Sequence, residues 1–357
     1  MNVVIAGGGT GGHLYPGIAI AREILSERGN QVLFLGTEQG IEARVLPKEG
    51  LPVRFLSVGK LKGMNILAIA RTLVMLPRSV YQAVRILRSV RPDVVIGVGG
   101  YASGPAGLAA FVLRVPLVLV EPNSYAGLAN RWLGKVAAKV VLCFPGTGAQ
   151  KFFDPEKTVI LGPLVRTGID QGDRDKALAA FGLGTNKYTV FVMGGSGGAH
   201  GINMAMKQAA SLLKGRHELQ VLHQTGDKDA ADVAAGYRDA GIRTAVLPYI
   251  TDMAGAYAVA DLVVCRSGAT TVAELAVCGK RAVLVPFPFA ADNHQEYNAR
   301  TLADRGSGEV IIQKDLTPKM LANRIIHYSG QGAASSQAPR MEQTAAAEIA
   351  RICKNYV

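Results

Sequence analysis

The sequence lacks the marks of a secreted or membrane-spanning protein. Its four cysteines show neither CxxC spacing nor a pairing pattern, so a reduced, cytosolic setting is expected. The basic segment of a signal peptide is missing from the N-terminus. No uninterrupted run reaches the roughly 20 apolar residues that span a bilayer, because Arg114 and Pro116 break the longest candidate. We therefore expect no disulfide framework and no transmembrane segment.

Acidic residues are absent between Glu49 and Asp93, in a chain whose formal net charge is +12. A basic, apolar-rich stretch of this kind fits either an amphipathic helix with a solvated basic face or a patch that rests on an anionic membrane surface. We favour the membrane surface for region 54–91. Aromatic side chains for base stacking are limited to Phe55 and Tyr81, so nucleic acid is not expected as a partner. The basic residues of this window are Arg54, Lys60, Lys62, Arg71, Arg78, Arg85, Arg88 and Arg91.

The residues that are present are typical of a two-domain α/β protein. Hydrophobic residues make up 49% of the 357 positions and charged residues only 18%, as in a globular chain long enough for two cores. Short apolar runs alternate with helical patterns, which indicates parallel sheets buried on both faces. We predict two Rossmann-like, doubly wound parallel-sheet domains at 1–163 and 164–340, and a C-terminal helix at 341–357 that packs back on the first domain.

The same strand–helix order is expected in both halves, which the polar connection 167–175 separates. Helices are predicted near 15–28, 64–89, 104–113 and 126–135, and the tail is predicted to form a long helix from about Ser335. Strands are predicted at 2–6, 31–35, 53–56, 93–97, 116–120, 139–143 and 158–161, and then at 188–193, 219–223, 244–247, 262–265, 282–285 and 308–312.

Two glycine-rich loops follow apolar runs, one in each half. The first spans Gly7 to His13 and the second spans Gly194 to His200. Glycines let the backbone approach a ligand closely, and the start of the next helix carries about half a positive charge. Both loops are therefore predicted to handle phosphates. A third loop, Gly97 to Pro105, is expected at the same sheet edge as the first.

A dinucleotide site is the alternative reading of the first loop. Gly7, Gly9 and Gly12 satisfy the G-x-G-x-x-G pattern. However, Leu35-Gly36-Thr37 replaces the acid that would bind the ribose, and Glu38 comes late. We therefore interpret the glycine loops as parts of a diphosphate-handling cleft.

Other candidate residues also follow predicted strands. His13 suits proton transfer or a phosphate hydrogen bond, although it could equally cap a helix. Thr271 and Glu274 have capping-box spacing, but we favour a helix start that binds an anion while Glu274 binds ribose hydroxyls. Polar side chains crowd 292–298, which favours a site there. The DxD sequence at 173–175 is interpreted as a helix cap, so no metal site is predicted.

These segments together resemble the MurG glycosyltransferases. Gly8 to His13 matches the GGTGGH loop of that family, and the similarity covers nearly the whole chain in order. It continues through 99–105, Glu121, Asn123, 126–130, Val165-Arg166, 194–196, 261–274, His294-Gln295 and Asn298.

The resemblance implies a fold, an activity and a location. The fold is GT-B, with two Rossmann-like domains that face a cleft. The activity is inverting, metal-independent transfer of N-acetylglucosamine from UDP-GlcNAc to the muramyl 4-hydroxyl of undecaprenyl-diphospho-MurNAc-pentapeptide (lipid I), which forms lipid II in peptidoglycan synthesis. No cofactor is implied. The family acts peripherally at the cytoplasmic face of the inner membrane, which strengthens the membrane reading of region 54–91.

The resemblance also assigns site residues. His13 is the first candidate for the general base and Glu121 the second. His13, Tyr101 and Asn130 are expected on the acceptor side. UDP-GlcNAc is expected to contact Arg166, Ser196, Ile250, Gly268, Thr270, Thr271, Glu274 and Gln295, with Thr10, Gly11, Gly12 and Asn123 across the transfer point.

Three segments depart from the family pattern. The family's His-Glu-Gln-Asn run is Val-Glu-Pro-Asn at 120–123, its Gly-Asn-Pro-Val-Arg run is Gly-Pro-Leu-Val-Arg at 162–166, and Gly197 stands where it has Gln in the 196–198 segment. Alternative functions are another GT-B glycosyltransferase or a UDP-sugar epimerase with a different acceptor. A nicotinamide oxidoreductase and a non-catalytic lipid-binding scaffold are more distant alternatives.

Overall fold

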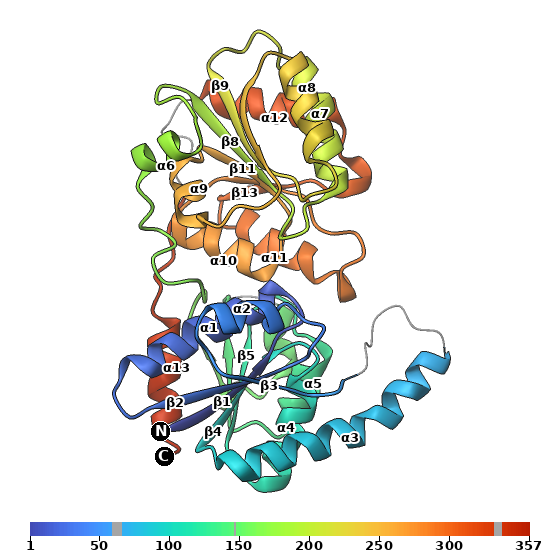
Figure 1. Ribbon diagram of the computed structural model, residues 1–357, viewed down its shortest axis with the longest axis vertical. Coiled ribbons are helices and arrows are strands. Elements are labelled where there is room, and N and C mark those ends of the chain that lie inside the picture. Colours follow the sequence, from blue (N-terminus) through green and yellow to red (C-terminus); the bar gives the residue numbers. More distant parts are fainter. Residues whose placement is uncertain (59–65, 146–147, 332–337) are drawn as a thin grey trace. The chain divides into compact units, whose positions relative to one another are not determined.

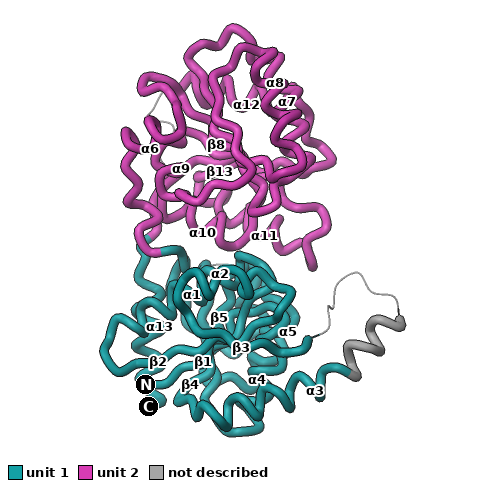
Figure 2. The backbone as a smooth tube through the Cα atoms, viewed as in Figure 1, with its two compact units in different colours: residues 1–166, 342–357 teal, residues 167–341 magenta. Residues whose placement is uncertain are grey.

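The computed structural model describes residues 1–58, 66–145, 148–331 and 338–357, with the backbone alone for 66–74. It consists of two compact units (Figure 2). Unit 1 comprises residues 1–166 together with 342–357, and unit 2 comprises residues 167–341. The domain ends predicted from the sequence, at 163 and 340, lie three residues and one residue from these divisions.

Unit 1 is built on a seven-stranded sheet in which every neighbouring pair is parallel (Figure 1). The strand order is β3-β2-β1-β4-β5-β6-β7, so the chain winds outward from β1 in both directions. The strands are β1 (Asn2–Gly7), β2 (Gln31–Gly36), β3 (Val53–Phe55), β4 (Val94–Gly99), β5 (Leu117–Glu121), β6 (Lys139–Leu142) and β7 (Thr158–Ile160).

Helices cover the first sheet, and three of them share one face. Leu87 of α3, Ala106 of α4 and Leu133 of α5 join one buried cluster with Val4 and Val95 of the strands. The C-terminal helix α13 packs on α1, and its residue Ile349 is fully buried. The helices are α1 (Gly11–Ser26), α2 (Glu42–Lys48), α3 (Ile66–Val90), α4 (Ser103–Leu113), α5 (Leu128–Leu133) and α13 (Ala345–Lys354), with 3-10 turns at Gly148–Phe152 and Pro155–Lys157.

Unit 2 repeats the design with a six-stranded parallel sheet of order β10-β9-β8-β11-β12-β13. Its strands are β8 (Tyr188–Met193), β9 (Leu219–Gln224), β10 (Arg243–Leu247), β11 (Leu262–Cys265), β12 (Ala282–Leu284) and β13 (Gly308–Val310). Its helices are α6 (Arg174–Ala180), α7 (His200–Leu212), α8 (Ala230–Asp239), α9 (Met253–Val259), α10 (Ala269–Cys278), α11 (His294–Ala303) and α12 (Pro318–Gly330), with 3-10 turns at Ala291–Asn293 and Gln313–Asp315.

The predicted fold class is confirmed, and each predicted strand is present with ends that differ by at most two residues. The predicted start of the C-terminal helix, near Ser335, is wrong. Residues 335–337 lie outside the described residues, and α13 begins only at Ala345. Before it, Ala338 and Met341 donate their N–H groups to Gly279 O (2.8 Å) and Ala276 O (2.9 Å), because this segment runs extended along unit 2.

Among the described residues, no helix is both long and apolar enough to cross a bilayer. The parallel strands of each sheet all end at one edge. The loops after β1, β2, β4 and β5 therefore gather at the carboxyl edge of the first sheet, and those after β8 to β12 gather at the carboxyl edge of the second.

Candidate functional site

The first glycine loop turns sharply from β1 into α1. Gly8 and Gly9 have positive φ values of 141° and 82°, which only glycine adopts without strain. The helix then begins at Gly11, earlier than predicted, so Gly11, Gly12 and His13 form its first turn. Thr10 is the N-cap residue, and its Oγ1 lies 3.3 Å from Nδ1 of His13.

The loop after β4 packs directly against the first glycine loop. Gly99 N–H donates to Ser103 Oγ (2.9 Å), whose hydroxyl donates to Ala6 O of β1 (2.7 Å). A Cβ on Gly99 would lie 2.7 Å from the His13 ring, and a Cβ on Gly9 would lie 3.4 Å from the Tyr101 ring. The structure therefore brings His13, Tyr101 and the first loop together.

Glu42 is a residue of this edge that the sequence analysis missed. It begins α2, is fully buried, and accepts hydrogen bonds from Gly9 N (2.7 Å), Thr37 N (2.8 Å) and Thr37 Oγ1 (2.8 Å). A Cβ on Gly8, and likewise on Gly36, would overlap its side chain. Glu38, the acid considered after the second strand, is exposed instead.

Glu121 and Asn130 are buried near the end of β5, and the half-buried Asn123 is hydrogen-bonded to Glu121. Glu121 is 1% exposed; its Oε1 accepts from Asn123 N and Nδ2 (3.0 Å each), and its Oε2 from Gly127 N (2.9 Å) and Asn130 Nδ2 (3.0 Å). Burial raises the pKa of the Glu121 carboxyl, although the four donors oppose that shift. Asn130 is itself buried, so these side chains support one another's positions.

Arg166 ends unit 1 and lies on the ring of Tyr15, with its guanidinium carbon 4.5 Å from the ring centroid. Tyr15 follows His13 by two residues in α1, and its ring would lie 3.4 Å from a Cβ on Gly11. Arg166 therefore lies beside the first glycine loop within its own unit.

The second glycine loop is held by Gln224, the last residue of β9, which is 3% exposed. Gln224 Nε2 donates to Gly195 O (2.8 Å), and its Oε1 accepts from Ile250 N (2.8 Å). One side chain thus ties the loop after β8 to the loop after β10. Ser196 lies exposed in the loop.

The loops after β11 and β12 carry the other predicted residues of unit 2. Gly268 is the N-cap of α10, so Thr270 and Thr271 lie in its first turn and the capping-box alternative for Thr271 is wrong. Glu274 is buried and accepts from Tyr257 OH (2.9 Å).

Gln295 lies beside this helix start. Its backbone O accepts from Ser267 Oγ (2.7 Å), and its Oε1 accepts from Phe287 N (3.0 Å). Ser267 therefore links Gln295 to the start of α10, the helix that carries Thr270, Thr271 and Glu274 after its N-cap Gly268.

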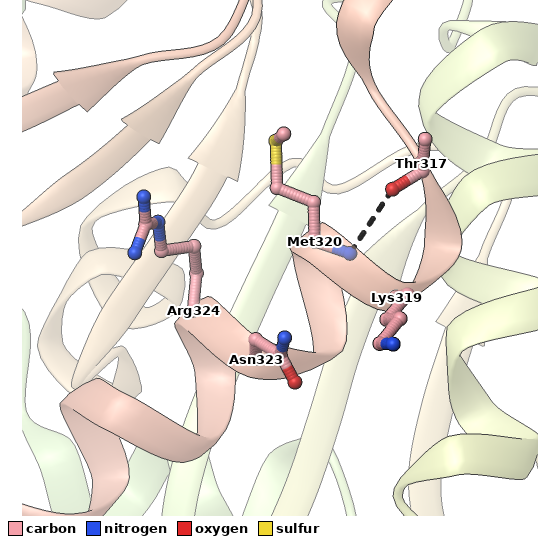
Figure 3. A pocket seen from close by; sticks show the side chains of 5 residues that line it. All are labelled: Thr317, Lys319, Met320, Asn323 and Arg324. Carbon is pink, nitrogen blue, oxygen red and sulfur yellow. Dashed lines mark hydrogen bonds between the residues drawn. The ribbon is translucent and has the colours of Figure 1, made fainter.

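Two other features lie outside these clusters. The Asp173 side chain accepts from Asp175 N and Lys176 N (3.1 Å each), so the interpretation of the DxD sequence as a helix cap is confirmed. A hollow of about 290 Å³ lies on the start of α12, and the sequence-predicted site residues do not line it (Figure 3).

A buried polar network holds the segment against which the second glycine loop packs. His223 Nδ1 lies 2.9 Å from Tyr237 OH and its Nε2 3.1 Å from Asn203 Oδ1, while Asn203 Nδ2 donates to Thr225 O (2.8 Å). Thr225 O occupies the place that a Cβ on Gly198 would need. Burial lowers the pKa of His223 to about 3.

Models of known protein families match both halves of the chain. The glycosyltransferase family 28 N-terminal domain matches residues 3–142, and the family 28 C-terminal domain matches residues 189–356. The chain is 44% identical over 327 residues to a protein of Thermodesulfovibrio yellowstonii, covering 91% of this chain and 89% of that one. It is 45% identical over 365 residues to a protein of Anaeromyxobacter sp. strain Fw109-5, covering 100% and 94%.

Both relatives are named UDP-N-acetylglucosamine–N-acetylmuramyl-(pentapeptide) pyrophosphoryl-undecaprenol N-acetylglucosamine transferase. Among solved structures, MurG of Acinetobacter baumannii is similar with a TM-score of 0.77 and 30% identity, covering 99% of both chains.

The buried His223 predicts a pH dependence of stability. The unfolded chain takes up a proton as the pH falls through about 6.5, whereas the folded ring stays neutral down to about pH 3, so stability present above pH 6.5 is lost on acidification. Urea unfolding between about pH 7 and pH 4 should show a slope that His223→Gln flattens by up to about 1.4 kcal/mol per pH unit. The exposed His217→Gln should keep the wild-type slope; equal slopes in all three proteins would contradict the assignment.

Proposed function

We propose a specific activity for this chain, which belongs to glycosyltransferase family 28: it transfers N-acetylglucosamine from UDP-N-acetylglucosamine to lipid I and forms lipid II. Full-length similarity to relatives named for this transfer carries the assignment. In addition, the residues assigned to the donor gather at the carboxyl edge of one parallel sheet, where α/β proteins bind nucleotides.

The donor is assigned to unit 2. The loop 194–198 and the start of α10 at Gly268 meet the charge of the diphosphate through backbone N–H groups, with no metal required. Ile250, whose N–H is bonded to Gln224 Oε1, is assigned to the donor contacts, and Glu274, which accepts from Tyr257 OH, is assigned to the ribose hydroxyls. Ser196, Thr270, Thr271 and Gln295 complete the donor contacts.

The acceptor is assigned to unit 1, with His13 as the general base. The muramyl 4-hydroxyl oxygen attacks the anomeric carbon, the bond to UDP breaks with its electron pair on the diphosphate, and the hydroxyl proton passes to His13. Attack opposite the leaving group inverts the anomeric centre. Thr10, within reach of the His13 ring, sets its orientation.

Glu121 is assigned a positioning role rather than that of the base. Its two oxygens already accept four hydrogen bonds from Asn123, Gly127 and Asn130, so the carboxylate holds the loop after β5. Its partners Asn123 and Asn130 hold the loop after β5, and Tyr101 borders the first glycine loop on the same side.

The surface of α3 to α5 is assigned to an anionic membrane face, on the cytoplasmic side. Arg78, Arg85 and Arg88 are exposed at helical spacing on α3, opposite the buried Ser79, Ala83 and Leu87. The neighbouring helices α4 and α5 expose Phe111 (58%) and Trp132 (66%). Lys60, Lys62 and the Arg71 side chain of the same window lie outside the described residues.

Sugar transfer itself is tested with radiolabelled donors and a short-chain lipid I. We expect transfer from UDP-GlcNAc and far less from UDP-GalNAc or UDP-glucose. UDP release should depend on the acceptor, whereas a UDP-sugar epimerase would act without one. If the chain transfers sugar to none of the forms of lipid I, the proposal is rejected.

His13→Ala should lower kcat by about 10²–10⁴-fold, because a general base contributes that much, while the Kd for UDP changes little. Single-turnover transfer and calorimetric titration of UDP measure the two quantities. His217→Ala, at an exposed position in unit 2, is the control. Unchanged turnover in His13→Ala would remove His13 from the base role.

Binding to anionic vesicles tests the membrane surface. Replacing Arg78, Arg85 and Arg88 by Gln should lower the affinity for phosphatidylglycerol vesicles by about 100-fold, since each basic residue contributes about 1 kcal/mol near the lipid. Co-sedimentation with the vesicles measures this affinity. The matched control replaces the exposed Lys228, Arg238 and Arg305 of unit 2 by Gln. An equal loss in the control would show that net charge alone is responsible and would count against this surface.

A further inference from the structure

Two buried polar side chains from different helices of unit 2 meet at a hydrogen bond. Tyr257 of α9 is 1% exposed and Glu274 of α10 is 2% exposed. The Tyr257 hydroxyl donates to Glu274 Oε2 at 2.9 Å. The strand β11 lies between the two helices in the sequence, so the fold creates this pair and no single local segment contains it.

We propose that Tyr257 is a positioning residue for the recognition of ribose: its hydroxyl holds the Glu274 carboxylate in the orientation that accepts from the ribose hydroxyls of the donor. The assignment of Glu274 to the ribose rests on the function proposed above. Tyr257 itself is assigned no contact with the donor, so it acts through Glu274 alone.

The first step of the argument concerns protons. Burial, and after it the charge of Glu274, raises the pKa of the Tyr257 phenol well above its usual value of 10. The hydroxyl therefore keeps its proton and is the donor of the hydrogen bond. The neighbouring thiols of Cys265 and Cys278 stay neutral as well, because burial raises the pKa of each.

The second step concerns orientation. A glutamate side chain has several rotatable bonds, and a ligand that must first order such a side chain binds less tightly. The bond from Tyr257 orders the carboxylate of Glu274 before the donor arrives. The Tyr257 ring is itself fixed, because it packs edge-to-face on Phe191 of β8 with ring centroids 5.8 Å apart.

The third step concerns the need for a hydroxyl at this place. Packing on Phe191 requires only an aromatic ring, which phenylalanine also supplies. A buried hydroxyl is costly unless it is hydrogen-bonded, and a bond to a carboxylate is about twice as strong as one between neutral groups. The choice of tyrosine at position 257 is therefore explained by Glu274.

The fourth step connects the pair to the other donor residues. Thr270 precedes Glu274 by four residues in α10, so the two lie on the same face of the helix. Thr270 is in the first turn of α10 and is assigned to the donor. Glu274 is thus held from behind by α9, on the helix whose start faces the nucleotide in the proposed function.

Calorimetric titration of UDP and of 2′-deoxy-UDP into the full chain tests the proposal, because these ligands differ by one ribose hydroxyl. The wild type should prefer UDP. Tyr257→Phe should weaken UDP binding about tenfold, or about 1.4 kcal/mol, and 2′-deoxy-UDP binding much less, so that the preference falls. In transfer assays the KM for UDP-GlcNAc should rise while kcat changes little, since the lost interaction binds ground state and transition state alike.

Tyr328→Phe is the matched control. It removes the hydroxyl of another buried tyrosine of unit 2, one that donates to Glu309 Oε2 at 3.5 Å, and it should keep the wild-type preference for UDP. Glu274→Gln should lose most of the preference, and Tyr257→Phe should lower it no further in the double variant, because the two residues act as one unit.

Three results would overturn the proposal. In the first, Tyr257→Phe weakens UDP and 2′-deoxy-UDP by the same factor, as a purely structural role requires. In the second, it weakens neither. In the third, Glu274→Gln keeps the full preference for UDP, so that Glu274 does not read the ribose. Absence of transfer to lipid I would instead reject the proposed activity, and the two nucleotide titrations would still decide the role of Tyr257.

Discussion

Parallel strand pairing is the constraint on which the rest of the structure depends. Because all neighbouring strands of each sheet run in the same direction, every strand ends at one edge, and the loops that leave it must share that edge. Both faces of each sheet must also be covered by helices, which removes the faces as places for a ligand. Backbone groups and short polar side chains therefore meet at the carboxyl edges, and the chemistry of each unit is confined to loops that differ by only a few side chains.

Much of this arrangement follows from the sequence because it is written in local patterns. Fully apolar runs such as 94–98 and 190–193 mark strands buried on both faces, and the glycines after them mark the turns. Glu42 was missed for a local reason as well. It begins a seven-residue helix that is too short to show a hydrophobic period, and it lies beyond residues 35–37, where a ribose-binding acid is expected. The signal that could have found it is the pair Gly36 and Gly40, which flank a loop with no other need for two glycines.

Contacts that depend on strand order could not be predicted from single segments. Gln224 reaches Gly195 because β9 pairs with β8 in a register that sets Gln224 opposite Met193, immediately before the loop. It reaches Ile250 because β10 lies on the other side of β9. The same holds for Arg166, whose guanidinium lies on the ring of Tyr15 in α1, a residue far from it in the sequence. Spatial neighbours of this kind are fixed only once the sheet has formed.

Two glycines of the second loop differ in whether packing requires them. At Gly198, with φ of 74°, a Cβ would overlap Thr225 O, so that position must be glycine for the loop to pack. Gly197 differs: a Cβ there would meet open space. The fold would therefore accept the glutamine that the family pattern has at this place, and glycine there leaves the loop without a polar side chain but has no packing consequence. Packing therefore requires glycine at position 198 but not at position 197.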